Sequence, residues 1–404
     1  MSVMHRYTGT SAKPLISKIL WKRNSATDTT QGPSPADDRR WMRVAIAEAR
    51  RAEGRTAPNP PVGCAIVSDD GRLVGTGHTA VGGRPHAEVE ALAMAGEAAH
   101  GATAYVTLEP CAHHGQTGPC ADALVEAGIA RVVVALRDPD ERVNGRGIDR
   151  LAGNDIALRI GVEAEAARRV VAGFLSRTTR SRPFVTLKTA TSLDGMIALA
   201  DGAKRWITGP RMRDYVHLQR SRSDGLLSAV GTVLADDPEF TCRLPGLGAD
   251  SPHRFILDGS LRTPVTARLF SAAGDIGLTF FCHEDADARA VSALQAAGAD
   301  VRPVVVGKDG KLSLVSVMQA ISGAGIGNLM IEAGGKLAAS LLREGMVDRI
   351  LWTSSQHLIG ADGIPSISSL ATRELPSQAS FCVIAEGSFG PDRFLMLERP
   401  HEID

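Results

Sequence analysis

One group of residues in the first third of the chain constrains its folding more than any other. His86 is followed two positions later by Glu88, and Cys111 is followed after an eight-residue gap by Cys120. Imidazole nitrogen and thiolate sulfur are preferred ligands of zinc, and a catalytic zinc has three protein ligands and an open fourth position. The chain is therefore expected to fold so that His86, Cys111 and Cys120 meet at a catalytic zinc.

The charge of this donor set suits such a metal. One neutral imidazole and two thiolates balance Zn²⁺, which lowers the pKa of a bound water from about 15.7 towards 7. Glu88 is expected to accept the water proton and return it to the substrate. Two cysteines alone would equally suit a protein core, where free cysteine is common, but the ordered set of four residues favours zinc.

Two more histidines, His113 and His114, lie between the cysteines. Either could bind the metal, but a fourth protein ligand would close the site to water. We therefore interpret His113 as a substrate contact and His114 as a surface residue.

Composition limits the class of protein. With 404 residues the chain can form two domains. Its 45 basic and 45 acidic residues give no net charge, and aromatic residues are only 4%, which argues against a nucleic-acid partner. The six cysteines form no disulfide framework, and no apolar run reaches the length of a membrane span. We expect a cytoplasmic enzyme with a small-molecule substrate. The sequence does not decide whether the chain forms a homo-oligomer.

The pattern of the first half predicts one domain. Residues 1–36 are basic and rich in Ser and Thr, which is also typical of a transit peptide, but we favour a disordered leader or a start codon placed too early. Asp37 or Asp38 is expected to cap a helix. Helices at 86–99, 120–127 and 162–175 then alternate with strands at 62–68, 72–77, 103–108, 130–136 and 156–160. This alternation over 37–175 predicts a three-layer α/β/α domain with a mixed sheet.

The second half is predicted to be another α/β domain. Residues 176–183 are short, polar and basic and are expected to be a linker. Over 184–404, strands are expected at 184–190, 225–230, 254–257, 277–282, 301–306, 328–332, 349–353 and 381–386. Helices are expected at 210–222, 285–297, 314–322 and 337–344. Residues 231–238 are expected to form a strand-to-loop segment.

One segment of the second half has the layout of a phosphate site. The apolar strand that ends at Glu332 is followed by Gly334, Gly335 and Lys336 and then by a helix. A helix N-terminus after a glycine turn binds anions, although glycines also simply end strands. The glycines at 323, 325 and 327 precede a strand and open no helix, so they do not predict a dinucleotide fingerprint.

Three stretches of the first half form a recognisable set: Pro58-Asn-Pro-Pro-Val-Gly63, His86-Ala-Glu-Val89 and Pro110-Cys-Ala-His-His-Gly-Gln-Thr-Gly-Pro-Cys120. They resemble the deaminase half of the bifunctional deaminase/reductase family of riboflavin biosynthesis. The resemblance implies a cytidine-deaminase-like fold, zinc on His86, Cys111 and Cys120, Glu88 as the proton carrier, and Asn59 in the pocket. Gln116 stands where the family usually has Arg, which puts one polar contact in doubt.

The second half resembles the reductase half of the same family, which has a dihydrofolate-reductase-like fold. The resembling motifs are Thr186-Leu-Lys-Thr-Ala-Thr-Ser-Leu-Asp-Gly195, Trp206-Ile-Thr-Gly209, Gly231-Thr-Val-Leu-Ala-Asp-Asp-Pro238, Leu261-Arg-Thr-Pro264 and Ile331-Glu-Ala-Gly334. The resemblance implies two groups of residues. Contacts to a pyrimidine ribotide would come from Lys204, Arg220, Asp236, Arg243 and Glu332, with the two arginines on its phosphate. Contacts to NADPH would come from Ala190, Trp206, Thr232, Gly334, Gly335 and Lys336.

Three points stay open within this resemblance. Gly335-Lys336 and Lys204 depart from the residues usual in the family. The group that protonates the ribose ring oxygen is either Asp236, our first choice, or Lys188. The expected activity is zinc-dependent deamination followed by NADPH reduction; the alternatives are a deaminase with a non-catalytic reductase-like domain and, less favoured, a nucleic-acid-editing deaminase.

Overall fold

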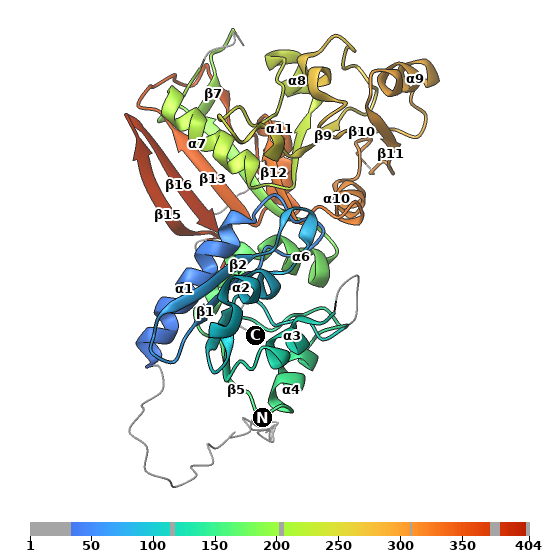
Figure 1. Ribbon diagram of the computed structural model, residues 1–404. Helices are drawn as coiled ribbons and strands as arrows, with labels where there is room; N and C mark the ends of the chain where they lie inside the picture. The colour runs from blue at the N-terminus through green and yellow to red at the C-terminus, as the bar shows by residue number, and fades with distance from the viewer. Residues whose placement is uncertain (1–33, 114–117, 202–205, 308, 372–379, 401–404) are drawn as a thin grey trace, which may run out of the picture.

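The protein consists of two α/β units stacked end to end. The computed structural model describes residues 34–113, 118–201, 206–307, 309–371 and 380–400. In Figure 1 the first unit forms the lower half, in blue to teal, and the second forms the upper half, in green to red. Each unit is built on its own sheet, which confirms the predicted class of two α/β domains. The expected leader falls on residues that the structure does not describe, apart from 34–36.

The first unit contains a five-stranded mixed sheet. Its order is β2-β1-β3-β4-β5; β1 pairs antiparallel with β2 and β3, and the β3–β4 and β4–β5 pairs are parallel. The elements are α1 (Pro35–Arg51), β1 (Gly63–Val67), β2 (Leu73–His78), η1 (Val81–Gly83), α2 (Ala87–Ala95), η2 (Gly96–Ala99), β3 (Thr103–Val106), α3 (Cys120–Glu126), β4 (Arg131–Val134), α4 (Arg146–Ala152), β5 (Ala157–Ile160) and α5 (Ala164–Val170).

Helix α1 is anchored by one apolar stripe and one buried acid. Met42, Ala45 and Ala49 recur at helical spacing and are fully buried against the sheet. The cap is Ser34 and not Asp37 or Asp38, because the Ser34 side chain accepts from the Asp37 amide and Asp37 returns the contact. Asp38 instead lies buried in the unit, where it pairs with Arg131.

The second unit contains a nine-stranded sheet. Its order is β11-β10-β9-β8-β12-β6-β13-β16-β15; the first seven strands are parallel, and β16 and β15 complete the edge antiparallel. The elements are β6 (Phe184–Thr191), β7 (Met196–Ala198), α7 (Pro210–Ser221), β8 (Gly225–Ala229), α8 (Val230–Asp236), η3 (Gly248–Asp250), β9 (His253–Leu257), η4 (Arg268–Ala272), β10 (Leu278–Cys282), α9 (Ala288–Ala296), β11 (Asp300–Pro303), α10 (Leu314–Gly323), β12 (Asn328–Glu332), α11 (Gly335–Arg343), β13 (Arg349–Ser354), β14 (Ile364–Pro365), β15 (Cys382–Phe389) and β16 (Asp392–Glu398).

Helices cover both faces of the parallel part of this sheet. Val317 and Ile321 of α10 and Leu341 of α11 join one buried cluster with Leu187 and Ile331. On the other face, α8 and α9 pack over β8, β9 and β10, and α7 packs over β12 and β13. Burial on both faces explains why the central strands are continuously apolar.

The segment expected to be a linker is largely helical. Residues 176–180 complete helix α6 (Ala172–Arg180), which directly precedes β6. The predicted helix 162–175 is in fact two helices, because α5 ends at Val170 and α6 starts at Ala172. Figure 1 shows α6 between the two halves. The units are thus joined by a helix rather than by an irregular tether.

One other prediction of local structure was wrong, and one strand was not predicted. Most of 231–238 is helix α8 and not an extended strand-to-loop segment. The last predicted strand is the first arm of a hairpin, β15–β16, whose second arm was not predicted. Among the described residues, no helix has the length and apolar character that crossing a bilayer requires.

Candidate active sites

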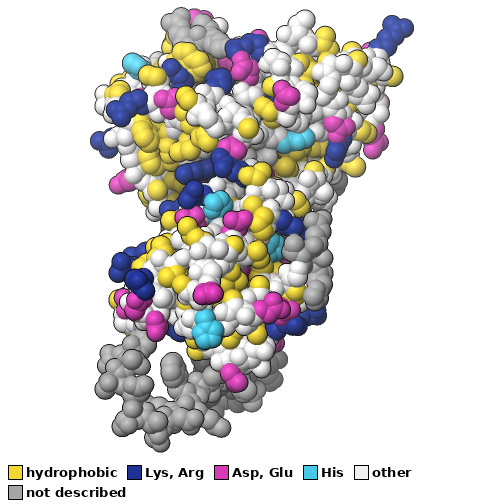
Figure 2. All heavy atoms as spheres, viewed as in Figure 1, with side chains coloured by type: hydrophobic (Ala, Val, Ile, Leu, Met, Phe, Trp, Pro, Cys, Tyr) yellow, Lys and Arg dark blue, Asp and Glu magenta, His cyan; other side chains and the backbone are white. Residues whose placement is uncertain are grey.

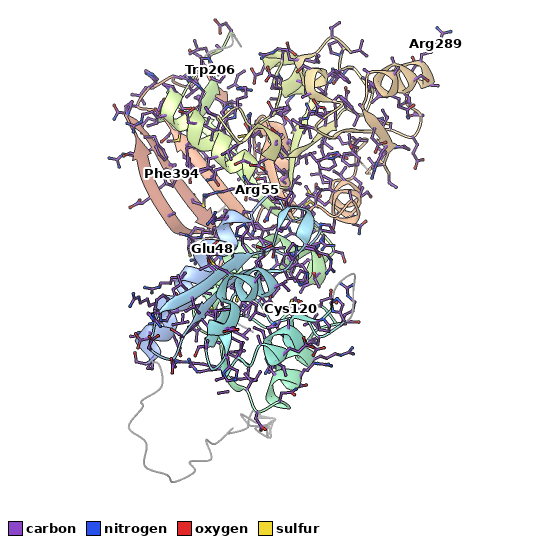
Figure 3. The ribbon with its side chains drawn as sticks, in the orientation of Figure 1. Glu48, Arg55, Cys120, Trp206, Arg289 and Phe394 are labelled. Atoms are coloured by element: carbon purple, nitrogen blue, oxygen red, sulfur yellow. The ribbon has the colours of Figure 1, made fainter. Side chains whose placement is uncertain are left out.

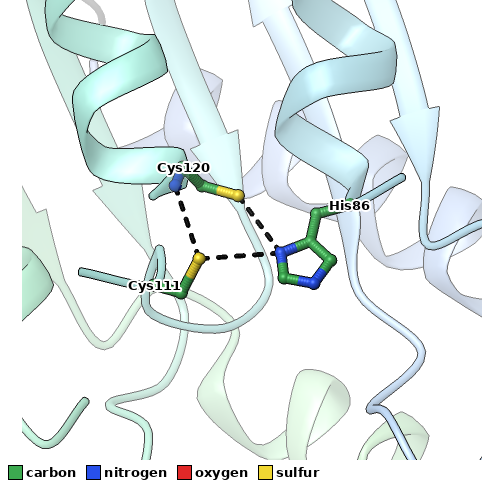
Figure 4. Close-up of side chains that lie close together, drawn as sticks. All are labelled: His86, Cys111 and Cys120. Atoms are coloured by element: carbon green, nitrogen blue, oxygen red, sulfur yellow. Dashed lines mark hydrogen bonds between the residues drawn. The ribbon is translucent and has the colours of Figure 1, made fainter. Parts of the chain in front are cut away.

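The three predicted zinc ligands meet at the ends of three elements. His86 is the N-cap of α2, Cys120 is the first residue of α3, and Cys111 follows β3. The His86 Nδ1 atom lies 3.2 Å from Cys120 Sγ and 3.6 Å from Cys111 Sγ. Figure 4 shows all three side chains pointing towards one another, and their ligand atoms lie within 4.8 Å of one another.

This donor set fits zinc. Tetrahedral bonds of about 2.0–2.1 Å to nitrogen and about 2.3 Å to sulfur place the nitrogen and a sulfur about 3.5 Å apart. The two observed nitrogen–sulfur distances, 3.2 and 3.6 Å, are close to that spacing. The Cys120 backbone amide also points at Cys111 Sγ, at 3.3 Å. Because a helix N-terminus stabilises negative charge, this amide favours the thiolate form that a metal requires.

The side chain next to this cluster is Glu88. It lies in the first turn of α2, two residues after His86, and is only 3% exposed. His86 has extended backbone angles, with φ −77° and ψ 161°, so it precedes the helix and its side chain is not held at a helical offset from that of Glu88. Burial, and then the negative charge of Cys111, raise the pKa of Glu88 to about 7.

The two cysteines differ in acidity. The hydrogen bonds that Cys111 accepts from Cys120 and from His86 lower the pKa of Cys111 to about 4. The same contact with Cys111, together with burial, raises the pKa of Cys120. Cys111 is thus the more acidic of the two thiols.

A buried carboxylate that sequence reasoning missed supports the Cys111 loop. Glu109 is 4% exposed and accepts hydrogen bonds from the backbone amides of Asp138, Gly145, Gly147 and Ile148. It therefore joins the end of β3 to the loop before α4 and fixes the chain two residues before a zinc ligand. The only signal in the sequence is an acid directly after an apolar strand.

The remaining predicted residues of the first site are Asn59, His113 and His114. Asn59 lies against Gly83: a Cβ atom at position 83 would approach Asn59 Nδ2 to 1.9 Å. His113 is half-buried, and its Nδ1 has no hydrogen-bond partner within the described part of the chain. His114 and Gln116 lie outside the described residues.

The predicted reductase residues that the structure describes all line one cavity. This cavity has a volume of about 1600 Å³ and lies at the carboxyl ends of the parallel strands β6, β8, β9 and β12, where ligands bind in open α/β sheets. Its volume exceeds that of a typical pocket for one small ligand, so it has room for a dinucleotide and a second molecule. The predicted residues on its wall are Ala190, Trp206, Arg220, Thr232, Asp236, Arg243, Glu332, Gly334, Gly335 and Lys336. Lys204 lies outside the described residues.

A buried ion cluster forms the floor of this cavity. The register of β6 against β12 pairs Lys188 with Glu332, and the Lys188 Nζ atom lies 3.5 Å from the carboxylate. Arg220 donates to both Glu332 oxygens, at 2.6 and 3.0 Å, and also to the Thr241 carbonyl. Burial alone would raise the pKa of Glu332, but the charges of Arg220 and Lys188 outweigh it and lower that pKa to about 2.

Arg243 and Asp236 lie nearer to solvent. The Arg243 side chain is 46% exposed and lies 3.6 Å from Glu239. Its backbone amide donates to Nδ1 of His217, a cavity residue that sequence reasoning missed. Burial, followed by Arg220 and Arg243, lowers the pKa of His217 to about 4, so this imidazole is neutral at physiological pH. Asp236 is the exposed last residue of α8.

The residues predicted to hold the cofactor suit a nucleotide. Gly334 is the N-cap of α11, and a Cβ atom there would meet open space. At Gly335 a Cβ atom would come within 2.5 Å of the Pro365 carbonyl, so only glycine lets the helix start here. Trp206 is 69% exposed, and the Arg213 guanidinium lies over its ring at 4.5 Å. A helix N-terminus for phosphates and an exposed ring for stacking are what a dinucleotide requires.

Two family models match the chain along its length. The cytidine and deoxycytidylate deaminase zinc-binding region matches residues 35–136. The RibD C-terminal domain matches residues 183–386, half of the chain. The first match covers β1 to β4 of the first sheet, and the second covers the second sheet except for β16 and the end of β15.

Known proteins match nearly the whole chain. It is 39% identical over 351 residues to the riboflavin biosynthesis protein RibD of Escherichia coli (strain K12), which covers 83% of this chain and 93% of that protein. It is 36% identical to RibD of Aquifex aeolicus (strain VF5), over 90% of this chain and 98% of that protein.

Solved structures extend the match to the fold. The structure of Acinetobacter baumannii RibD, form 1, has a TM-score of 0.81 at 35% identity and covers 91% of this chain and 100% of that one. A diaminohydroxyphosphoribosylaminopyrimidine deaminase/5-amino-6-(5-phosphoribosylamino)uracil reductase from Thermotoga maritima has a TM-score of 0.77 at 30% identity, over 91% of this chain and 99% of that one. The chain belongs to the RibD family, bifunctional enzymes of riboflavin biosynthesis that join a zinc-dependent deaminase to an NADPH-dependent reductase.

Proposed function

We propose that the first unit deaminates a diaminohydroxyphosphoribosylaminopyrimidine and that the second unit reduces the ribosyl group of the product, 5-amino-6-(5-phosphoribosylamino)uracil, to a ribityl group. These are the compounds in the name of the Thermotoga maritima relative. The observation that carries the proposal is the pairing of a His/Cys/Cys cluster beside a buried glutamate with one large cavity that holds every described reductase candidate.

The residues of the first site have distinct roles in this proposal. His86, Cys111 and Cys120 hold zinc, which when bound supplies a water polarised for attack on the amino-bearing ring carbon. Glu88 takes one proton from that water and delivers it to the ring nitrogen, and it then carries a second proton from the added hydroxyl to the amino group, which leaves as ammonia. Asn59 lines the pocket and orients the ring.

The second site binds two anionic molecules. NADPH supplies the hydride, and Ala190, Trp206, Thr232 and the turn from Gly334 to Lys336 hold it. Arg243, whose guanidinium reaches solvent, is the main contact to the substrate phosphate. Arg220 already binds both oxygens of Glu332, so its role is to fix that carboxylate against the ribose hydroxyls. Asp236 remains our first choice for the proton donor and Lys188 our second.

One assay on the purified full chain tests both halves. With the diaminopyrimidine ribotide, ammonia release should be followed by NADPH oxidation in equal amount. A chain that releases ammonia but neither binds nor oxidises NADPH would leave the second unit without a catalytic role. Deamination of an oligonucleotide, with none of the ribotide, would overturn the substrate.

Three broader features belong to the same proposal. The deaminase unit covers 37–175 and the reductase unit 184–404, each with its own sheet. The enzyme works on small molecules in the cytoplasm without a nucleic-acid partner, which agrees with the absence of net charge and with cysteines that are all unpaired in the structure. Its oligomeric state is open.

A further inference from the structure

The loop that carries Asn59 lies where the two units meet. This loop, residues 54–59, is closed on itself: the Thr56 hydroxyl donates to the Asn59 carbonyl, and the Asn59 amide donates to the Thr56 carbonyl, both at 2.9 Å. Its Arg55 carbonyl also accepts from the Gly82 amide. In Figure 3, Arg55 lies at the level where the lower and upper halves meet, whereas Cys120 lies within the lower half.

Residues beyond the deaminase unit bind this loop at two points. Arg177, in the connecting helix α6, donates from Nη2 to the Pro58 carbonyl at 2.6 Å, one residue before Asn59. At the second point, Arg55 of the loop pairs with Asp250 of the second unit at 2.5 Å. Figure 2 shows basic side chains gathered near the level where the two halves meet.

The contact between loop and second unit leaves almost no free space. A Cβ atom at Gly54 would come within 2.3 Å of the Ser221 carbonyl, so the loop backbone rests directly on the end of α7. The cavity that remains beside Pro58 and Asn59 measures about 10 Å³ and is also lined by Arg177, Asp224 and Gly325. That volume is at the limit for a single water. Close contact at Gly54 therefore restricts movement of the loop towards the second unit.

We infer that Arg177 and Asp250 are positioning residues for deamination, which act by holding the Asn59 loop from outside the deaminase unit. This inference rests on the proposed role of Asn59 in the deaminase pocket. The reductase unit then has a second role, because its Asp250 helps to hold the loop that carries Asn59 in the deaminase active site. Each contact involves a charged group, so each is stronger than a neutral hydrogen bond.

The first test separates substrate binding from turnover. Arg177→Met keeps the length of the side chain but removes the donor to Pro58, and it should raise the KM for ammonia release about fivefold, with kcat within twofold, as expected for the loss of one charge-assisted hydrogen bond. Arg177→Lys restores a donor and should return the KM to near the wild-type value. NADPH oxidation with pre-deaminated substrate should not change. Asp250→Asn should act on KM in the same direction.

Matched controls come from the same elements and the same chemistry. Arg180→Met is the control for Arg177→Met, because Arg180 lies on the same helix but pairs with Asp348 and not with the loop. Asp300→Asn breaks another Arg–Asp pair, Arg302–Asp300, on the surface of the second unit. Both controls should deaminate with wild-type KM.

Two results would overturn the inference. One is a wild-type KM for ammonia release in both Arg177→Met and Asp250→Asn. The other is a parallel fall of both activities together with the Tm, which would mean a purely structural role. Asn59→Ala distinguishes failure of this inference from failure of the proposed role of Asn59. If Asn59→Ala deaminates normally, the assigned role of Asn59 is wrong. If Asn59→Ala has a raised KM while the Arg177 and Asp250 variants are normal, only the positioning role of Arg177 and Asp250 is refuted.

Discussion

Glu88 is a buried carboxylate in the first turn of α2, beside the cluster of zinc ligands. Glu88→Gln preserves the size of the side chain but cannot carry a proton. Ammonia release should therefore fall by at least about 100-fold, since positioned acid/base groups contribute about 10²–10⁴ in rate. Zinc content, measured by mass spectrometry of metals, and reduction of pre-deaminated substrate should both be retained.

The exposed neighbour Glu90 provides the comparison for this experiment. Glu90→Gln changes the same chemical group on the same helix, outside the cluster, and should release ammonia normally. If Glu88→Gln lost both activities together, the assignment of the two reactions to separate units would be wrong.

The carboxylate of Glu332 should make stability depend on pH. Its pKa of about 2 lies below the ordinary value of 4.5, so its stabilising contribution is complete above about pH 4.5 and is lost as the pH falls towards 2. The difference corresponds to about 3 kcal/mol at neutral pH. The gap in unfolding free energy between wild type and Glu332→Gln should therefore narrow from pH 7 to pH 3 in urea unfolding followed by tryptophan fluorescence.

The pH dependence needs an exposed acid for comparison. Glu386 lies on the edge strand β15 and is exposed, so Glu386→Gln should differ little from wild type at either pH. A gap for Glu332→Gln that stays constant between pH 7 and pH 3 would contradict the lowered pKa of this carboxylate.

At the scale of residues, the side chains that bind the metal could be predicted from the sequence, but the hydrogen-bond and ion-pair partners of individual side chains could not. A histidine, a glutamate and two cysteines in a fixed order can be recognised because metal chemistry restricts which side chains serve. Two contacts depend instead on which segments become neighbours in the fold: Arg220 binds Glu332, and Glu109 accepts hydrogen bonds from four backbone amides. Glu332 lies 112 positions from Arg220 in the chain, and no local pattern joins them.

At the scale of elements, α4 holds the Cys111 loop through close contact. A Cβ atom at Gly147, in the first turn of α4, would come within 1.9 Å of the Pro110 carbonyl. Gly147→Ala should therefore displace the backbone next to Cys111 and weaken zinc binding about tenfold, a loss typical when the groups that orient a metal ligand are disturbed. Competition with a chromogenic chelator measures this affinity directly.

The other end of the same helix supplies the control. Gly153 is the C-cap of α4, and a Cβ atom there would make only an ordinary contact, 3.4 Å from the Asp149 carbonyl. Gly153→Ala should bind zinc as the wild type does. Equal zinc affinity in Gly147→Ala would show that the helix does not restrain the ligand loop.

Elements with a clear period were predicted better than elements defined by their neighbours. The stripe of Met42, Ala45 and Ala49 predicted α1 because burial imposes a helical period. The helical character of 176–180 was not predicted because Arg177, Arg180 and Arg182 give a polar sequence, yet these side chains bind Pro58 and Asp348 in the folded protein. The second arm of the β15–β16 hairpin was missed for a related reason: β16 lies between β13 and the edge strand β15, antiparallel to both, and nothing in the sequence marks that position.

At the scale of the whole molecule, the two sites are separate but not independent. Within the described part of the chain, the residues that line the cavity of the second unit all lie from Lys188 onward, whereas the zinc ligands all precede Lys188. The contacts of Arg177 and Asp250 join the units through the Asn59 loop and not through either set of reacting groups. The architecture therefore predicts that each chemical step needs its own site together with the folded partner unit, and not an active partner site.

Complementation between two full-length variants tests this prediction. Glu88→Gln should keep a working reductase, and Glu332→Gln, once shown to have lost NADPH oxidation, should keep a working deaminase. A mixture of the two purified chains should convert the diaminopyrimidine ribotide to the ribityl product after a lag, because the deaminated intermediate must leave one chain and accumulate before another chain reduces it. The lag should shorten as the Glu332→Gln chain is increased, and either chain alone should give no ribityl product. If the mixture gave none while each chain retained its single activity, the intermediate would have to pass between sites within one assembly.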